Sequence, residues 1–173
     1  MNTVNKLMFL WEPDAQRARD CTVTPTTSYG LLSQLIREWH STLPISPPGM
    51  RVGFLICSPN QVPIGAAMWG RPVARLEDQG ATLELTRLAH SLAAPYNLGS
   101  WALARMRKWI RENMPEIRRV ISYQNADVHD GTIYKADNWE QVYEVWDSKS
   151  TWTNREGRVG TEVRHRIKWE RIP

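Results

Sequence analysis

The sequence predicts a single α/β domain in which a mixed, mostly antiparallel sheet is flanked by helices. Its 173 residues are enough for one domain with one hydrophobic core. Short apolar runs of strand length alternate along the chain with two segments of helical periodicity. No internal repeat, low-complexity tract or linker divides the chain, so we expect one unit over residues 1–173.

The first part of the chain predicts three strands and a helix. Residues 7–11 form an apolar run that predicts a first strand, which Pro13 ends. Residues 28–39 show helical spacing of apolar side chains, with Thr27 or Ser28 available as the N-cap. Residues 51–57 and 64–69 are apolar runs joined by a segment with two prolines, and they predict an antiparallel hairpin.

The second part predicts a central strand, a long helix and the remaining strands. Residues 81–89 are apolar without strict alternation, which indicates a central strand. Residues 99–113 combine an apolar stripe with a basic face, and Pro115 ends this helix. Further strands are expected over 120–123, 141–146 and 163–169, with a short helix around Tyr134.

The turn Asn97-Leu98-Gly99-Ser100-Trp101 joins the central strand to the long helix. Such a turn exposes backbone N–H groups at the positive end of the helix dipole, which favours phosphate. We therefore expect a phosphorylated cofactor or a nucleic acid there. The alternative is an ordinary helix start, capped by Asn97 or Ser100 and without a ligand.

Downstream, the fragment Gly131-Thr132-Ile133-Tyr134-Lys135-Ala136-Asp137-Asn138-Trp139 predicts a short helix with an outward-facing Tyr134. The order of strand, phosphate-binding helix, strand, Tyr-bearing helix and strand resembles the back half of a GNAT acyltransferase. Several short motifs in the right order resemble, more specifically, the phage Mom family of GNAT-like enzymes that modify adenine in DNA. These are Trp39-His40, Ile64-Gly65-Ala66-Ala67, Gly70-Arg71-Pro72, Leu85-Thr86-Arg87-Leu88, Asn97 with Ser100, and residues 129–139.

The resemblance implies a phage-encoded enzyme in the cytoplasm of the bacterial host. It would transfer an acyl-type group to the exocyclic N6 amine of adenine in DNA and so protect the DNA from host restriction. Mom chemistry installs a carbamoylmethyl group, which plain acetyl transfer does not produce. A glycine-derived donor and iron-assisted chemistry therefore stay open beside acetyl-CoA.

The GNAT resemblance also implies where acetyl-CoA or another acyl-CoA binds. The pyrophosphate would lie on Asn97, Leu98, Gly99 and Ser100, and the pantetheine arm along the strand that ends at Leu88. The sequence departs from the usual GNAT phosphate loop, because Tyr96 stands where a Gln or Arg is usual and Gly99 is the loop's one glycine.

Four residues are the catalytic candidates: His40, Arg87, Asp127 and Tyr134. An Arg inside an apolar strand must find a partner or face a cleft, so Arg87 either contacts a substrate or cofactor anion or pairs with Glu84. His40 either takes part in catalysis or interacts with the C-terminus of its helix. Tyr134 lies where GNAT enzymes often place the acid that protonates the leaving thiolate.

Asp127 lies with His129 and Asp130 in the loop after a predicted strand, where α/β folds collect active residues. With His40, this loop supplies nitrogen and oxygen donors for a divalent iron, with His40, Asp127 and His129 as the candidate ligands. No fixed ligand spacing marks the set, and a solvated surface loop is the alternative.

The resemblance implies double-stranded DNA as a partner, and the charge distribution offers a surface for it. The formal net charge is +4, and residues 150–173 carry six Lys or Arg against three Glu, so this C-terminal strand extension is basic. We expect Arg71, Arg164, Arg166 and Lys168 to contact phosphates, although an ordinary solvated face is the alternative. Of the nine Trp, the two that we expect to stack on a base are Trp69 and Trp152.

Other features exclude several classes of protein. Cys21 and Cys57 are the two cysteines, which argues against a disulfide scaffold or a thiolate zinc site. The apolar run before Glu12 is only five residues long, residues 7–11, so we expect neither a signal peptide nor a membrane span. A homodimer stays open. The sequence is also compatible with two other functions: an N-acetyltransferase for a small amine or a protein, and a DNA-binding protein without catalysis.

Overall fold

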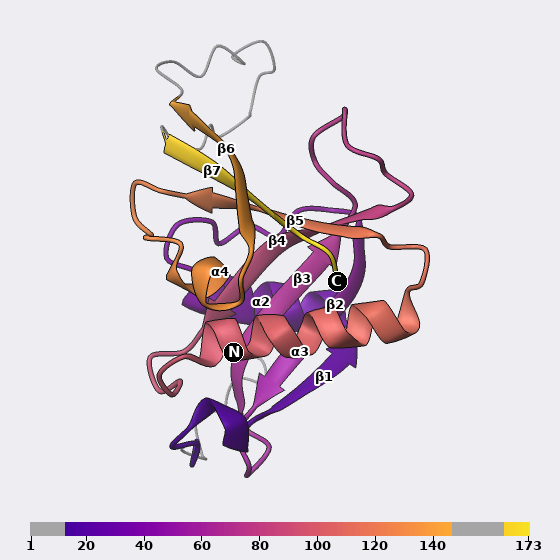
Figure 1. Ribbon diagram of the computed structural model, residues 1–173. Coiled ribbons are helices and arrows are strands. Elements are labelled where there is room, and N and C mark those ends of the chain that lie inside the picture. The colour runs from indigo at the N-terminus through magenta and orange to yellow at the C-terminus, as the bar shows by residue number, and fades with distance from the viewer. Residues whose placement is uncertain (1–12, 147–164) are drawn as a thin grey trace.

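The computed structural model describes residues 13–146 and 165–173. They form one seven-stranded sheet in the order β1-β2-β3-β4-β5-β7-β6 (Figure 1). All neighbouring strands are antiparallel except β4 and β5, which confirms the mixed, mostly antiparallel sheet. The strands are β1 Thr22–Thr26, β2 Met50–Cys57, β3 Pro63–Gly70, β4 Thr82–His90, β5 Arg119–Asn125, β6 Glu140–Trp146 and β7 His165–Arg171.

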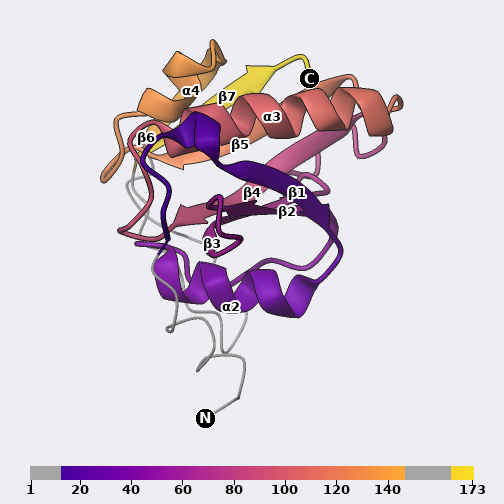
Figure 2. The ribbon, with the colours of Figure 1, turned by 90° about the horizontal axis from the view of Figure 1, so that it is seen from below.

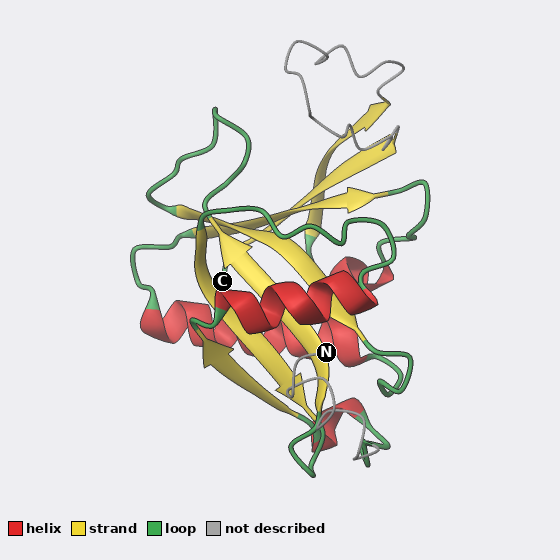
Figure 3. Ribbon diagram, turned by 180° about the vertical axis from the view of Figure 1, so that it is seen from behind, coloured by secondary structure: helices red, strands yellow, loops and turns green. Residues whose placement is uncertain are grey.

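Helices cover both faces of the sheet, as Figure 2 shows. They are η1 Ala18–Asp20, α2 Tyr29–Trp39, α3 Leu98–Asn113 and α4 Thr132–Ala136. Helix α2 packs against β2, β3 and β4. In the view from behind, the strands that α2 does not cover extend beyond it (Figure 3). Helices α3 and α4 lie on the opposite face, over the larger of the two cores. Among the described residues, no helix combines the length and the apolar character needed to cross a bilayer.

The predicted elements agree with this fold, with two differences in the first part of the chain. Strand β1 was not predicted, because its sequence Thr-Val-Thr-Pro-Thr contains a proline and lacks an apolar run. An edge strand tolerates both features. The strand predicted over residues 7–11 lies outside the described residues.

A bulge in β4 opens the sheet beside β5. Leu85 pairs with Trp69 and Arg87 with Met68, so Thr86 is an extra residue, and its hydroxyl donates to the Met68 carbonyl at 3.1 Å. Strands β4 and β5 are paired only as far as Leu85 and Ser122, although both strands continue. Bulges bend a strand and re-aim its side chains. Beyond the bulge, β4 therefore separates from β5 and Arg87 faces the α2 side of the sheet.

Candidate active site

A cleft of about 520 Å³ opens where β4 and β5 separate. Consecutive residues of both strands line it, including Ser122, Tyr123 and Gln124 of β5. Successive side chains of a strand point to opposite faces. The cleft is therefore a passage through the sheet, open towards α2 on one side and towards α3 and α4 on the other. The loop after α2, the start of α3 and residues 129–134 complete its walls.

Arg87 lies in this cleft and fixes the loop that follows α2. Its Nε donates to the carbonyls of Leu43 at 3.1 Å and Ile45 at 3.0 Å, and its Nη2 donates to Ile45 at 2.6 Å. Its Nη1 donates to the carbonyl of Thr86 at 2.5 Å. A guanidinium has five N–H donors. Arg87 uses three of these donors, so two of its N–H groups have no acceptor among the described residues.

The positive charge of Arg87 has no ion-pair partner among the described residues. Glu84 is buried and accepts the backbone N–H of Val73 at 2.8 Å, and no ion pair joins it to Arg87 in the described part of the chain. The alternative of a structural Arg87–Glu84 pair is therefore wrong. Burial lowers the pKa of Arg87, an effect that the charge of Glu84 opposes, and an arginine stays protonated nonetheless.

His40 is held in one tautomer by the loop that it begins. Its Nδ1 accepts the backbone N–H groups of Thr42 at 3.3 Å and Leu43 at 3.1 Å. Burial, with smaller contributions from the charges of Arg87 and His129, lowers its pKa to about 4. The ring is therefore neutral at pH 7 and carries its proton on Nε2. As a neutral ring it is not a cation on the C-terminus of α2, and it enters the cleft as a hydrogen-bond donor rather than a base.

Tyr134 points inward, which corrects the expected outward orientation. Its ring is 8% exposed and packs between Trp139 and Trp169. Its hydroxyl lies 2.8 Å from Oγ of Ser122, which donates its own proton to the carbonyl of Leu85 at 3.2 Å. Tyr134 is therefore the donor to Ser122. Burial raises the pKa of Tyr134, so a protonated phenol sits where β4 and β5 stop pairing.

The start of α3 has free backbone donors, and one of their residues, Gly99, lines the cleft. Asn97 adopts a left-handed conformation with φ 64° and its side chain does not cap the helix, while Ser100 donates back to the carbonyl of Asn97 at 3.2 Å. Within the described residues, the N–H groups of Gly99 and Ser100 have no acceptor, whereas that of Leu98 donates to Pro95. The Leu98 side chain belongs to the core. The backbone N–H of Asn97 has no acceptor in the described part of the chain either, so Asn97, Gly99 and Ser100 keep free donors among the predicted phosphate contacts.

The sequence matches the Mom protein family over residues 33–171. The chain belongs to the Mom protein family. A comparison with curated protein sequences gives no significant match. The match to the family over residues 33–171 confirms the predicted resemblance.

Solved structures with the same fold as this Mom family chain are GNAT-type acetyltransferases. A Bacillus subtilis acetyltransferase in complex with CoA matches with a TM-score of 0.61 at 9% identity, over 88% of this chain and 99% of that one. Spermidine N-acetyltransferase from Vibrio cholerae, in complex with CoA and spermine, gives 0.61 at 7% identity over 89% and 96%. A GNAT family acetyltransferase from Bacillus anthracis gives 0.52 at 11% identity over 69% and 65%. At such identities the comparison establishes the fold alone.

The proposed iron ligands of this Mom family chain do not come together. Asp127 is exposed and does not line the cleft, because its carboxylate accepts the backbone N–H of His165 at 3.2 Å. The structure thus places Asp127 outside the cleft, and its assignment as a catalytic residue stays a prediction. His40 and His129 do line the cleft, but Nδ1 of His40 already accepts two backbone N–H groups, those of Thr42 and Leu43. Over residues 13–146 and 165–173, no group of three or more His, Cys, Asp or Glu could hold a metal ion.

The predicted DNA contacts divide into three groups. Trp69 is fully buried, stacks on Trp139 and donates to the sulfur of Met106 at 3.3 Å, so base stacking by Trp69 is wrong. Lys168 is buried too, with its ammonium on Glu77 and above the ring of Tyr143, so it is not a phosphate contact. Arg71 and Arg166 are exposed and available. Trp152 and Arg164 lie outside the described residues.

Sequence reasoning missed the residues that shape the cleft. Thr86 forms the bulge, Ser122 holds Tyr134, and Tyr123 lines the passage with a pKa that burial raises. The one sequence signal was polarity inside apolar strands, at Thr86 and at Ser122.

Proposed function

We propose that this protein transfers an acyl-type group to the exocyclic N6 amine of adenine in duplex DNA, as a phage-encoded enzyme that protects DNA from restriction in the bacterial cytoplasm. Membership of the Mom family supports the choice of DNA. The observation that carries the proposal is the passage between β4 and β5, because a donor and an acceptor can enter it from opposite faces of the sheet and meet between the strands.

The α3 side of the passage suits the donor, an acyl-CoA. The free N–H groups of Gly99 and Ser100 lie at the positive end of α3 and suit its pyrophosphate. The unpaired edge of β4, from Thr86 to His90, offers backbone groups to an extended pantetheine arm. The thioester supplies an activated carbonyl for attack by an amine.

The α2 side suits the nucleobase. The two free N–H groups of Arg87 can bind acceptor atoms of the base or its phosphate. His40 donates from Nε2 towards an oxygen on which negative charge develops, which is the role of an oxyanion donor. The phenol of Tyr134 lines the cleft and is protonated, so it can protonate the leaving thiolate when its O–H turns away from Ser122. The adenine amine is uncharged at neutral pH, so attack needs no prior deprotonation, and the proton that its nitrogen loses as the amide forms replaces the one that Tyr134 gives to the thiolate.

The cleft argues against a polyamine as acceptor. A site for a small cationic amine should be acidic, yet Asp130 is the one carboxylate among the described residues that line the cleft, beside Arg87 and three histidines. An uncharged nucleobase fits this lining better.

A thermal shift experiment with acetyl-CoA and with duplex DNA tests the proposal. A ligand that binds only the folded state at 100 times its Kd adds about 2.7 kcal/mol of stability. We expect shifts of the melting temperature with both ligands. A shift with acetyl-CoA alone would favour a small-amine or protein acetyltransferase, and a shift with DNA alone would favour a binding protein without catalysis.

Ser100 offers a matched pair of variants for the donor side. Its hydroxyl contacts only the carbonyl of Asn97 in its own turn, so Ser100→Ala and Ser100→Glu should both fold. Ser100→Glu places a negative charge at the helix N-terminus, which stabilises the helix but repels a phosphate. We expect Ser100→Glu to lose the acetyl-CoA shift and Ser100→Ala to keep it. An unchanged shift in Ser100→Glu would place the cofactor elsewhere.

A further inference from the structure

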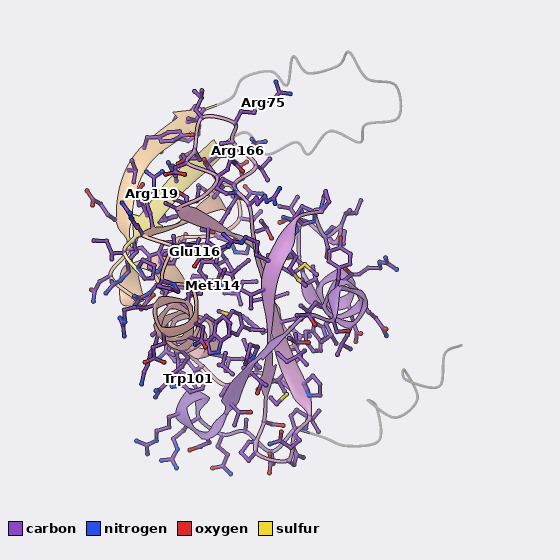
Figure 4. The ribbon with its side chains drawn as sticks, turned by 90° about the vertical axis from the view of Figure 1, so that its right-hand side faces the viewer. Arg75, Trp101, Met114, Glu116, Arg119 and Arg166 are labelled. Atoms are coloured by element: carbon purple, nitrogen blue, oxygen red, sulfur yellow. The ribbon has the colours of Figure 1, made fainter. Side chains whose placement is uncertain are left out.

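The loop between β3 and β4, residues 71–81, presents apolar and basic side chains that the cleft does not use. Leu76 is fully exposed, with a relative exposure of 102%, and Val73 is 69% exposed. Arg71 and Arg75 are exposed beside them, and neither forms an ion pair within the described part of the chain. Arg75 lies at the outer end of the molecule in Figure 4. The loop is thus an apolar tip between free cations.

This loop is held firmly although its tip is in solvent. Gln79 donates its side-chain amide to the carbonyls of Pro72 and Ala74, each at 3.2 Å. Glu77 binds Arg119 at 2.5 Å and also binds Lys168, which ties the loop to β5 and β7. Leu76 therefore stays exposed on a fixed support, where the hydrophobic effect opposes its position. A rigid apolar projection suits insertion into a partner.

The β3–β4 loop shares a support with the cleft. The backbone N–H of Arg71 donates to the carbonyl of Gly49 at 3.2 Å, and Gly49 ends the loop that begins at His40. Arg87 fixes the middle of the same loop through Leu43 and Ile45. Both features therefore border the α2 side of the sheet, the side assigned above to the nucleobase. Figure 1 shows the β3–β4 loop projecting from the end of the sheet.

We propose that the β3–β4 loop is a DNA wedge, in which Arg71 and Arg75 bind backbone phosphates and Leu76 inserts between stacked bases. This inference rests on the proposed function and adds how a stacked adenine becomes accessible. An exocyclic amine in duplex DNA is reached only when its base leaves the stack, and apolar side chains between base steps lower the cost of unstacking. The charge of a polyanion complements the two free arginines. Two apolar side chains are too small a patch for a stable protein interface.

Unstacking can be measured separately from transfer. A 20-base-pair duplex containing 2-aminopurine, whose fluorescence rises when it unstacks, is titrated with the protein without any acyl donor. We expect saturating protein to raise the fluorescence several-fold, and Leu76→Ala to lose most of that rise. The matched control is Ile172→Ala, which truncates another exposed apolar side chain, 77% exposed and distant in sequence. Equal fluorescence in the two variants, or no rise with the unchanged protein, would overturn the wedge.

Arg71→Gln combined with Arg75→Gln tests the phosphate contacts. The slope of log affinity against log salt changes by about 0.9 for each phosphate contact to duplex DNA, so the double variant should flatten it by about 2. An unchanged slope would remove both arginines from the interface.

Transfer assays then separate the wedge from the proposed function. If the protein modifies adenine, Leu76→Ala should slow modification of duplex DNA at least tenfold while sparing single-stranded DNA. If the fluorescence rises as expected and no adenine is modified, the wedge stands and the proposed reaction fails. Equal slowing on duplex and single strands would contradict a role in unstacking.

Discussion

Two arginines, the buried Arg107 and the half-buried Arg87, have different hydrogen-bond partners. Arg107 of α3 binds Asp137 through two charged hydrogen bonds, both 2.6 Å long, in a buried pair that also receives the indole N–H of Trp139. Among the residues that the structure describes, Arg87 of β4 binds only neutral carbonyls and keeps two N–H groups without an acceptor. The first charge is balanced within the protein and the second is not.

This difference predicts a structural role for Arg107 and a binding or catalytic role for Arg87. A buried charge without a counter-ion is costly, so a fold keeps one only where surrounding dipoles or a ligand compensate. The carbonyls of Leu43, Ile45 and Thr86 supply dipoles to Arg87 but no negative charge. Arg107 should therefore matter for stability, and Arg87 for binding and turnover.

The largest expected effect is on the balanced pair. Asp137→Ala leaves Arg107 buried without its partner and should lower the free energy of unfolding by about 3–5 kcal/mol. Urea denaturation measures this loss. The double variant Arg107→Met with Asp137→Leu removes both charges and should recover part of the stability. A loss below about 1 kcal/mol in Asp137→Ala would contradict the structural role assigned to the Arg107–Asp137 pair.

Replacement of the unbalanced arginine should affect catalysis more than stability. Arg87→Met should lower the transfer rate by about 10²–10³-fold, the range for loss of one well-placed donor. The free energy of unfolding should fall by only about 1–2 kcal/mol, since the lost partners are carbonyls that loop water can reach. Single-turnover kinetics and urea denaturation give the two values. Full activity in Arg87→Met would remove Arg87 from the site.

Tyr134 tests the point where the two strands separate. Tyr134→Phe removes the hydroxyl that donates to Ser122 and should slow transfer by about 10²-fold if that hydroxyl is the acid. Ser122→Ala is the matched control, because it removes the partner and keeps the phenol. An unaltered rate in Tyr134→Phe would make Tyr134 a packing residue between Trp139 and Trp169.

A third arginine, Arg166, lies on the protein surface and is a predicted DNA contact. It is exposed on β7, next to the buried and paired Lys168. If Arg166 contacts a phosphate, Arg166→Glu should weaken duplex binding at moderate salt by more than about 1 kcal/mol. Arg37→Glu, on the exposed side of α2, is the control and should change affinity less. Equal affinities in the two variants would place the DNA away from β7.

The pH dependence of stability should report on His40. Its pKa is near 6.5 when unfolded and about 4 when folded, so the unfolded state takes up the proton first. The stability contributed by neutral His40 is complete above pH 6.5 and is lost as the pH falls from 6.5 to 4. Denaturation from pH 4 to 8 should show this loss, and His40→Gln should reduce it. An identical pH profile in His40→Gln would show that the folded ring titrates normally.

Local pattern predicted the fold but not the details of the site. Helical spacing over residues 28–39 and 99–113 located α2 and α3, since a long amphipathic helix records its buried face in every turn. Arg87 inside an apolar strand indicated a cleft, but the bulge at Thr86 is one extra residue whose only mark is a polar side chain, so the separation of β4 from β5 was not predicted. Tyr134 lies in a helix of five residues, too short for periodicity to assign a face.

The predicted DNA contacts that proved wrong are residues whose burial depends on tertiary contacts. Alternation along β7 assigned Lys168 to a solvated basic face, but the β3–β4 loop brings Glu77 over that face. Trp69 is an aromatic residue in a strand, and only the packing of α3 and Trp139 against β3 shows that it is buried. The meeting of His40 and Arg87, 47 positions apart in the chain, likewise depends on contacts that no local window contains.

The most direct test is mass spectrometry of nucleosides from plasmid DNA of bacteria that express this protein, beside cells that express Arg87→Met. The account predicts a new adenine-derived mass with the unchanged protein and its absence with Arg87→Met, both proteins being folded. The mass would also identify the transferred group. Unmodified adenine from cells that contain folded protein, with purified protein that acetylates a small amine instead, would contradict the account.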